Sequence, residues 1–152
     1  ATVVARTAGK LWMIDRETFS TLTVSFAIKQ REKYLQFLRT VNFIRTFASR
    51  GWLSESRLED LADALRPRYY APNQRIIEQD DRNAEEMFFI ESGSVKVFRT
   101  EADGQTKELT TLGPGQYFGE LALIENRPRY ATVIAVEKSR LATLDAKSFE
   151  NL

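Results

Sequence analysis

FGELALIENRPRYATV, residues 118–133, is the stretch of this sequence that decides the fold. It places Gly119 before a short helix-forming run, Glu120–Ile124, and then Arg129 directly after a proline. The first turn of a helix has N–H groups without partners and the positive end of the helix dipole, so it attracts anions. Glycine lets a ligand approach the backbone closely, and a guanidinium can donate two parallel hydrogen bonds to a phosphate. The stretch therefore predicts a phosphate site, beside which Glu120 can accept a hydrogen bond from a sugar hydroxyl.

The sequence around this stretch changes its hydrophobic period after Pro67. From there on, short strand-like runs alternate with turn signals such as Pro72-Asn73, Ser92-Gly93 and Asp103-Gly104. Many short strands at close spacing are typical of an antiparallel β-barrel or jelly roll. We therefore expect an α+β fold with helices flanking the barrel and a short phosphate-binding helix within it. The expected strands are Tyr69–Tyr70, Arg75–Glu78, Met87–Glu91, Ser94–Arg99, Lys107–Leu112, Ala131–Val136 and Arg140–Leu144.

Two helices are expected before the barrel. Asp15 is a good N-cap, because its carboxylate can accept hydrogen bonds from the first N–H groups of a helix, and we expect that helix to run from Arg16 to Phe43. A second helix is expected to begin at Ser56-Arg57-Leu58-Glu59, which has the form of a capping box, and to end before Pro67. One face of the second helix is apolar, at Leu58, Leu61, Ala62 and Leu65.

The chain also contains an internal repeat. ATVVARTAGKLWMIDRETFSTL, residues 1–22, aligns without a gap with ATVIAVEKSRLATLDAKSFENL, residues 131–152, and eight of the 22 pairs are identical. Chance would give about one or two identities at average composition. The matched pairs include Asp15 with Asp145, at the start of the helix. A repeat at an offset of 130 residues has the length of a whole domain.

The repeat sets the expected domain organisation. Residues 1–43 are interpreted as the tail of a preceding repeat, a strand pair plus a connecting helix, and residues 44–152 as the domain that contains the phosphate site. The strand pair would be Ala1–Val4 and Leu11–Ile14. Without the other strands of its own domain, this hairpin would dock on the helix that follows, pair with another copy of the chain, or be disordered; its apolar side chains favour the first two.

Composition narrows the possible functions. The formal net charge of +1 gives no long-range reason to bind nucleic acid or an anionic membrane, and no apolar run is long enough to span a bilayer. The chain has no His and no Cys, which excludes Ser-His-Asp and Cys-His catalysis, Cys/His zinc sites and disulfides. We expect no catalytic residues and no metal. A chain without Cys suits the reducing cytosol, and we expect a cytoplasmic protein.

The stretch FGELALIENRPRYATV resembles the phosphate-binding cassette of cyclic nucleotide-binding domains, and most of all that in the second domain of the regulatory subunits of cAMP-dependent protein kinases. The resemblance covers the whole chain, because LADAL before a proline, MFFIESGSVKVF and GPGQYFGELAL occur in the order of the family. Taken alone, Glu120 and Arg129 would be an ordinary surface ion pair. Within the whole cassette they are identified as ligand-binding residues.

The resemblance implies a role for each matching residue. Glu120 would bind the ribose 2′-hydroxyl and Arg129 the cyclic phosphate, while Glu85 would be the acidic residue that orients the arginine. Backbone N–H groups near Leu121, Ala122 and Ala131 would complete the phosphate site, and Gly119 would let the ligand approach the backbone closely. No cofactor is implied; the ligand would be cAMP, or else cGMP.

The sequence departs from the family at two places. Tyr130 follows the cassette arginine, where Ala is usual in sites that prefer cAMP and Thr or Ser in sites that prefer cGMP; it either covers the base or lies on the surface. The loop Asp80–Glu85 lacks the two glycines usual there. Asp and Asn tolerate the left-handed conformation that glycine supplies, so we expect the turn to persist.

The expected function is therefore regulatory. A cyclic nucleotide, with cAMP preferred, would bind and cause the flanking helices to rearrange, which would be relayed to the catalytic subunit or domain of a protein kinase. A domain of a cGMP-dependent protein kinase is the alternative within this class. A small barrel enzyme is disfavoured, because such enzymes usually use His-rich metal sites and this chain has no His. A purely structural domain is disfavoured because Glu120 and Arg129 are both present.

Overall fold

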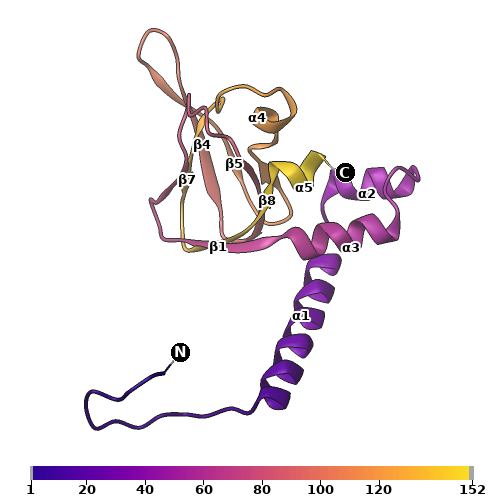
Figure 1. Cartoon of the computed structure of the whole chain (residues 1–152). Helices are drawn as coiled ribbons and strands as arrows, with labels where there is room; N and C mark the ends of the chain where they lie inside the picture. Colours follow the sequence, from indigo (N-terminus) through magenta and orange to yellow (C-terminus); the bar gives the residue numbers. More distant parts are fainter. Residues whose placement is uncertain (1, 151–152) are drawn as a thin grey trace. The chain divides into compact units, whose positions relative to one another are not determined.

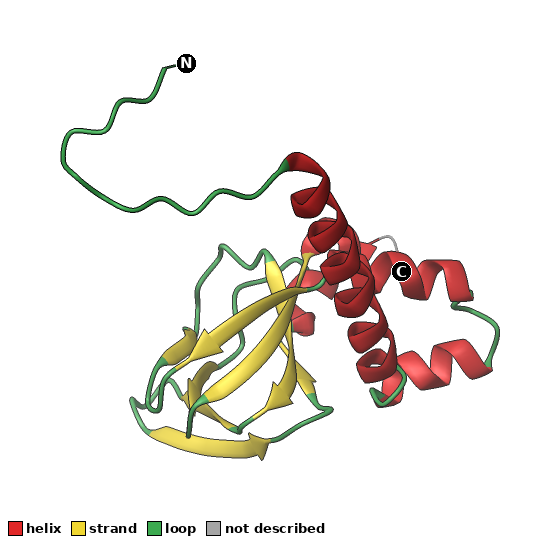
Figure 2. Cartoon of the chain, turned by 90° about the horizontal axis from the view of Figure 1, so that it is seen from below, coloured by secondary structure: helices red, strands yellow, loops and turns green. Residues whose placement is uncertain are grey.

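Eight strands pair antiparallel in two four-stranded sheets of the computed structural model, which describes residues 2–150. One sheet has the order β1-β8-β3-β6 and the other β2-β7-β4-β5. Figure 1 labels β1 and β8 of the first sheet and β4, β5 and β7 of the second. This confirms the expected α+β fold with an antiparallel barrel (Figure 2). The strands are β1 (Arg66–Tyr70), β2 (Arg75–Ile77), β3 (Glu86–Ser92), β4 (Val95–Thr100), β5 (Thr106–Leu112), β6 (Tyr117–Phe118), β7 (Thr132–Ala135) and β8 (Ser139–Asp145).

The helices are α1 (Arg16–Leu38), α2 (Asn42–Ser49), α3 (Glu55–Ala64), α4 (Glu120–Ile124) and α5 (Ala146–Glu150). The short helix α4 has the expected bounds. The single helix expected from Arg16 to Phe43 was wrong, because the chain turns after Leu38 and begins α2 at Asn42. At this turn the amide of Val41 donates to the carbonyl of Leu38 and Val41 becomes fully buried, so the break places an apolar side chain in the core.

The start of α3 also differs from the expectation. Its N-cap is Ser54, whose hydroxyl accepts a hydrogen bond from the Arg57 amide at 3.3 Å, and not Ser56. The apolar face is confirmed, since Leu58, Leu61 and Ala62 are buried. Pro67 follows the helix as expected, but it lies within β1. Within residues 2–150 that strand pairs only with β8, and proline is tolerated in an edge strand.

The core has two parts that meet at β3. Met87 and Phe89 lie in an apolar cluster with α2, α3 and the end of α1, whereas Phe88 and Ile90 lie in the interior of the barrel. Successive side chains of a strand point to opposite faces, so a strand that is buried on both faces shows a continuous apolar run. MFFI in β3 is such a run, and it joins the helices to the barrel.

The chain divides into two compact units, Ala1–Gln30 and Arg31–Leu152. This division differs from the domain boundary predicted after residue 43, and the assignment of residues 1–43 to a preceding repeat remains a prediction. Helix α1 contributes to both units. In the second unit its Lys33 donates to the buried carboxylate of Glu91 at 2.7 Å, and Arg140 contacts the same carboxylate at 3.2 Å.

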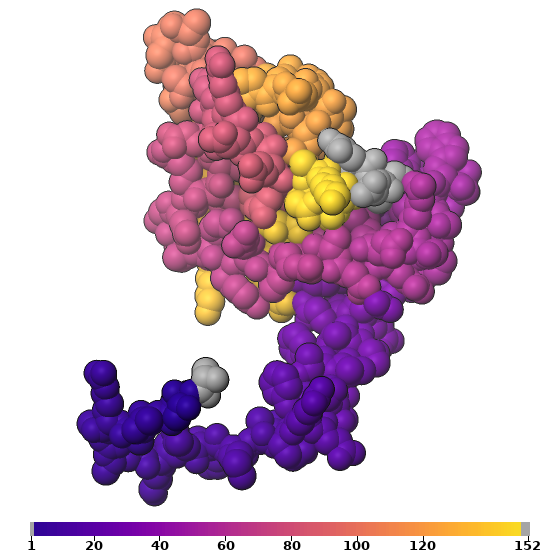
Figure 3. All heavy atoms as spheres, viewed as in Figure 1, coloured from indigo at the N-terminus to yellow at the C-terminus, as the bar shows by residue number. Residues whose placement is uncertain are grey.

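The strand pair expected at Ala1–Val4 and Leu11–Ile14 was wrong for the residues that the structure describes. Residues 2–15 form no strand, and their side chains are exposed. In the space-filling view this indigo segment is a string of side chains without an interior of its own (Figure 3). Isolated hairpins are marginal in water, and the other strands of a sheet are needed to stabilise one. Among residues 2–150, no helix is long and apolar enough to cross a membrane.

Candidate functional site

Gly119 joins β6 to α4 and sets the direction of the helix. Its φ of 86° is in the left-handed region, where glycine is favoured. A Cβ atom at this position would lie 2.8 Å from Nη1 of Arg129 and 3.2 Å from Cδ1 of Ile77. Glycine is therefore required at this position for two reasons, the positive backbone angle and the close approach of the Arg129 side chain.

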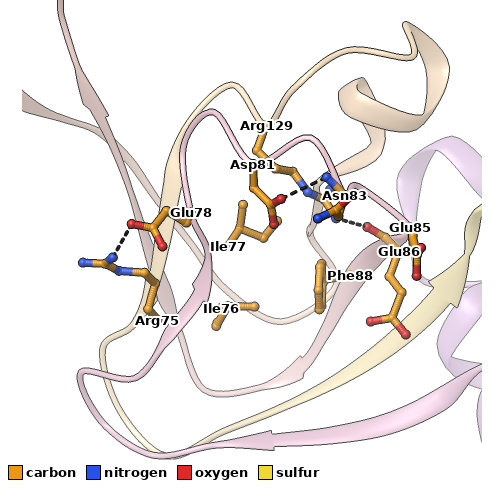
Figure 4. Close-up of a pocket in the computed structure, with 10 residues that line it drawn as sticks. All are labelled: Arg75, Ile76, Ile77, Glu78, Asp81, Asn83, Glu85, Glu86, Phe88 and Arg129. Atoms are coloured by element: carbon orange, nitrogen blue, oxygen red, sulfur yellow. Dashed lines mark hydrogen bonds and ion pairs between the residues drawn. The ribbon is translucent and has the colours of Figure 1, made fainter.

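Arg129 is a buried cation, with only 6% of its surface exposed. Its Nη1 donates to the Gly119 carbonyl at 2.8 Å. Its Nη2 donates to the Glu86 carbonyl at 2.6 Å (Figure 4). Its backbone is also fixed, because its amide donates to the backbone carbonyl of Asp81 and its carbonyl accepts from the backbone amide of Asp80. Burial lowers the pKa of the Arg129 guanidinium, while nearby carboxylates oppose that shift, and arginine keeps its charge in proteins. The structure therefore holds the charged guanidinium of Arg129 in a fixed position.

A cavity of about 260 Å³ lies beside this guanidinium, between β6, α4 and the strands of the second sheet. The structure brings all seven residues predicted for the site together around it. They are Gly119, Glu120, Leu121, Ala122, Arg129, Tyr130 and Ala131. The rest of the lining was not predicted and is largely apolar, at Ile77, Val97, Thr110, Leu112, Tyr117, Phe118 and Val133. All seven belong to strands, and outside the two-residue strand β6 their alternation along the strand was the only signal in the sequence that they face inward.

Glu120 opens α4 next to the cavity. Burial raises the pKa of its carboxyl above the ordinary value of 4.5, and hydrogen bonding to its own backbone and the charge of Arg129 act in the opposite direction. The carboxylate is thus partly desolvated, and the charge of Arg129 does not reverse that effect. Such a group is suited to accept hydrogen bonds from hydroxyl groups that enter the cavity.

Tyr130 lies at the rim, 45% exposed, so it both lines the cavity and reaches solvent. The guanidinium of Arg99 lies 4.0 Å from the centroid of its ring, and that of Arg127 lies 5.8 Å away. Arg127 is also paired with Glu125 at 2.8 Å. The two possibilities left by the sequence, covering a base or lying on the surface, are therefore both compatible with this position.

The loop between β2 and β3 positions Arg129 from its other side. Asp80 has a φ of 67°, so an aspartate does adopt the left-handed conformation that glycine usually supplies. Glu85 was expected to orient Arg129. Glu85 does line a second cavity of about 380 Å³ that Arg129 also borders, but it is to the carbonyl of Glu86 that the guanidinium donates a hydrogen bond (Figure 4). A main-chain partner has no signature in the sequence, which is why it was missed.

Among the carboxylates near Arg129, that of Asp81 has the largest effect on the guanidinium. It raises the pKa of the guanidinium more than the carboxylates of Glu86 and Glu120 do. Asp81 also accepts a hydrogen bond from the Asn83 amide at 2.9 Å, which closes the loop (Figure 4). Despite these carboxylates, no group of three or more acidic side chains within residues 2–150 is arranged to hold a metal ion.

Comparison with known proteins gives consistent matches. The family model described as cyclic nucleotide-binding domain matches residues 67–152. The cAMP-dependent protein kinase type II regulatory subunit of Drosophila melanogaster is 42% identical over 100% of this chain, which covers 38% of that protein. The regulatory domain of Toxoplasma gondii PKA, solved with cAMP, has a TM-score of 0.80 at 30% identity and matches 90% of this chain and 50% of that chain.

A further structure is similar but binds a different ligand. The regulatory subunit of a cAMP-independent protein kinase A from Trypanosoma cruzi, solved with guanosine, has a TM-score of 0.74 at 32% identity, over 91% of this chain and 46% of that chain. The chain thus spans half or less of the length of these relatives.

Proposed function

We propose a function from one premise: this chain belongs to the cyclic nucleotide-binding domain family. The proposal is that the cavity of about 260 Å³ binds cAMP and that the domain is a regulatory module of a protein kinase. The observation that carries it is Arg129, a buried guanidinium held at the cavity by the carbonyls of Gly119 and Glu86. A buried cation is costly unless it is paired, and the phosphate of a cyclic nucleotide would supply the anion.

The arrangement supports a role for each group. A guanidinium carries five N–H groups, and the two carbonyls use two of them, which leaves donors for a phosphate. The amides of Leu121 and Ala122 belong to the first turn of α4, and that of Ala131 lies on the same cavity. Glu120 would accept a hydrogen bond from the ribose 2′-hydroxyl. Tyr130 would contact the base. We expect cAMP to be preferred over cGMP, because Tyr130 is not one of the small hydroxyl residues, Thr or Ser, that are associated with cGMP sites.

The signal would pass through the flanking helices by a shift of population. Ligand would favour one arrangement of the helices around the barrel, and the catalytic subunit or domain of a kinase would bind the other. A ligand can shift such an equilibrium only by its difference in affinity for the two states. The coupling is reciprocal, so binding of the kinase must weaken binding of cAMP by the same factor.

The repeat supports a tandem arrangement in which residues 1–43 belong to a preceding domain and this domain is the second of the pair. The Asp15 carboxylate accepts from the Thr18 amide and hydroxyl at 2.8 and 2.7 Å, and the Asp145 carboxylate accepts from the Ser148 amide and hydroxyl at 2.8 and 3.0 Å. The two helix starts at the offset of the repeat thus use the same cap. We also propose that the protein is cytoplasmic, and this proposal rests only on its similarity to the kinase regulatory subunits.

Calorimetric titration with cAMP, cGMP and adenosine tests the proposal. The parent chain should bind cAMP more tightly than cGMP, and adenosine far more weakly, because adenosine has no phosphate. Arg129→Lys should lose about 2–4 kcal/mol of binding free energy, because a point charge replaces the planar fork.

The matched control is Arg127→Lys, two residues away, which removes an exposed guanidinium that is paired with Glu125. It should bind cAMP like the parent. Equal affinity of the parent for adenosine and cAMP, or an Arg129→Lys variant that binds cAMP normally, would contradict the assignment of the phosphate site.

A further inference from the structure

The guanidinium of Arg99 packs on the ring of Tyr130, which lines the cavity beside Arg129. The guanidinium carbon of Arg99 is 4.0 Å from the centroid of the ring, which is direct stacking distance. It also forms a loose ion pair with Glu101 at 3.7 Å. The side chain is about one-third exposed, so the stack is partly protected from solvent.

The register of the second sheet explains how this contact arises. Val97 and Arg99 are two residues apart in β4 and therefore lie on the same face of the sheet, and Val97 lines the cavity. In the neighbouring strand β7, Thr132 pairs with Phe98, so Tyr130, two residues before Thr132, lies beside the end of β4. The strand thus presents an apolar side chain to the cavity and a planar cation to the aromatic ring at its rim.

We infer that Arg99 is a positioning residue for base recognition, which holds the Tyr130 ring as the wall against which a purine base lies. The inference rests on the proposed function, since it requires a cyclic nucleotide in the cavity. A ring fixed on one face by a guanidinium has lost its freedom before the ligand arrives, so less entropy is lost when a base packs against it. A purine presents a larger surface to such a wall than a pyrimidine does, so the wall favours purines.

Arg127 is a weaker candidate for the same role. It lies 5.8 Å from the ring centroid and its guanidinium is already engaged by Glu125 at 2.8 Å. Arg99 is closer to the ring and is carried by a strand, which fixes its backbone more firmly than a loop does.

The test compares cAMP with cUMP, which share the ribose and the cyclic phosphate and differ in the base. Arg99→Gln should lower the ratio of cAMP to cUMP affinity by about two- to fivefold. Lys96→Gln is the matched control, because it removes one positive charge from the same strand at an exposed residue paired with Glu108. The control should leave the ratio unchanged, because both ligands carry the same phosphate.

A second variant separates positioning from direct contact. Tyr130→Leu should lower the ratio by at least as much, and adding Arg99→Gln to it should change the ratio no further. An unchanged ratio in Arg99→Gln, or an effect of Arg99→Gln that persists in the Tyr130→Leu background, would overturn the role of Arg99 and leave the proposed function standing. A parent chain that binds neither nucleotide would overturn both.

Discussion

At the scale of single residues, Gly119 gives the sharpest prediction. Gly119→Ala places a Cβ atom 2.8 Å from Nη1 of Arg129 at a φ of 86°, so the guanidinium must leave the Gly119 carbonyl. We expect the free energy of unfolding to fall by about 1–3 kcal/mol and cAMP affinity to fall with it.

Gly115→Ala is the matched control for this change. It has a similar φ of 81°, but nothing lies within 4 Å of the added Cβ atom. Thermal unfolding should show a loss of stability in both variants, and titration should show a loss of cAMP affinity in Gly119→Ala alone. A loss of affinity in both would mean that backbone strain, and not the displaced guanidinium, is responsible.

Glu120 gives a prediction that depends on pH. Since burial raises the pKa of its carboxyl in the folded state, the folded protein binds more protons than the unfolded one just above the ordinary value of 4.5. The stability that protonated Glu120 contributes must therefore decrease as pH rises from the ordinary pKa of 4.5 through the raised pKa of the folded state. Glu120→Gln removes this contribution, so the difference in melting temperature should move in favour of the variant as pH rises.

The same substitution tests the ribose contact. Glu120→Gln should reduce the preference for cAMP over 2′-deoxy-cAMP by a few-fold, because a neutral amide accepts a weaker hydrogen bond than a carboxylate. Glu125→Gln, in the C-cap of the same helix, should retain the full preference. If the parent itself binds the two ligands equally, Glu120 does not contact the 2′-hydroxyl.

At the scale of secondary-structure elements, Asp145 caps α5. Its pKa is lowered chiefly by the hydrogen bond from the Ser148 amide, so its stabilisation is present above the ordinary value of 3.8 and is lost as pH falls through the lowered pKa. Asp145→Ala should cost about 1 kcal/mol at neutral pH. Asp145→Asn should keep most of the cap while removing this part of the pH dependence of stability, and denaturant unfolding at two pH values would show both effects.

The elements differ in how far the sequence could predict them. Strands such as β3 and β8 and the helix α4 could be predicted, because their patterns are local: apolar runs between turn residues, and a helical run between Gly119 and a proline. The end of α1 could not, since the turn there buries Val41 against residues that are distant in the sequence. The two-residue strand β6 is defined by pairing with β3 and has no period of its own.

The site divides in the same way. The side chains of Glu120, Arg129 and Tyr130 could be predicted from the cassette, because each belongs to one continuous stretch. The carbonyl of Glu86 and the stacking of Arg99 could not, because they depend on which strands become neighbours in the fold. Sequence reasoning therefore predicted the polar groups of the cassette and missed both the apolar lining of the cavity and the contacts that hold Arg129 and Tyr130 in place.

At the scale of the whole molecule, the first fourteen residues should be dispensable for binding. Every residue that lines the cavity belongs to the unit Arg31–Leu152. Leu11 and Trp12 are 94% and 101% exposed, so this segment presents apolar surface to solvent.

Deleting residues 1–14 should leave cAMP affinity within about twofold of the parent and should increase solubility or reduce self-association. Titration and light scattering at several protein concentrations would measure the two effects. Loss of cAMP binding on deletion would place these residues in the site and contradict the division of the repeat.

The position of β3 has a consequence for amide hydrogen exchange. This strand has a paired neighbour on each side, β8 and β6, and its side chains are buried on both faces. Its central amides can therefore reach deuterated solvent only when the whole domain opens, so their exchange rate reports the full opening equilibrium. A ligand that binds only the closed domain slows that exchange in proportion to its concentration over its dissociation constant. The protection of these few amides therefore measures how much of the protein has ligand bound.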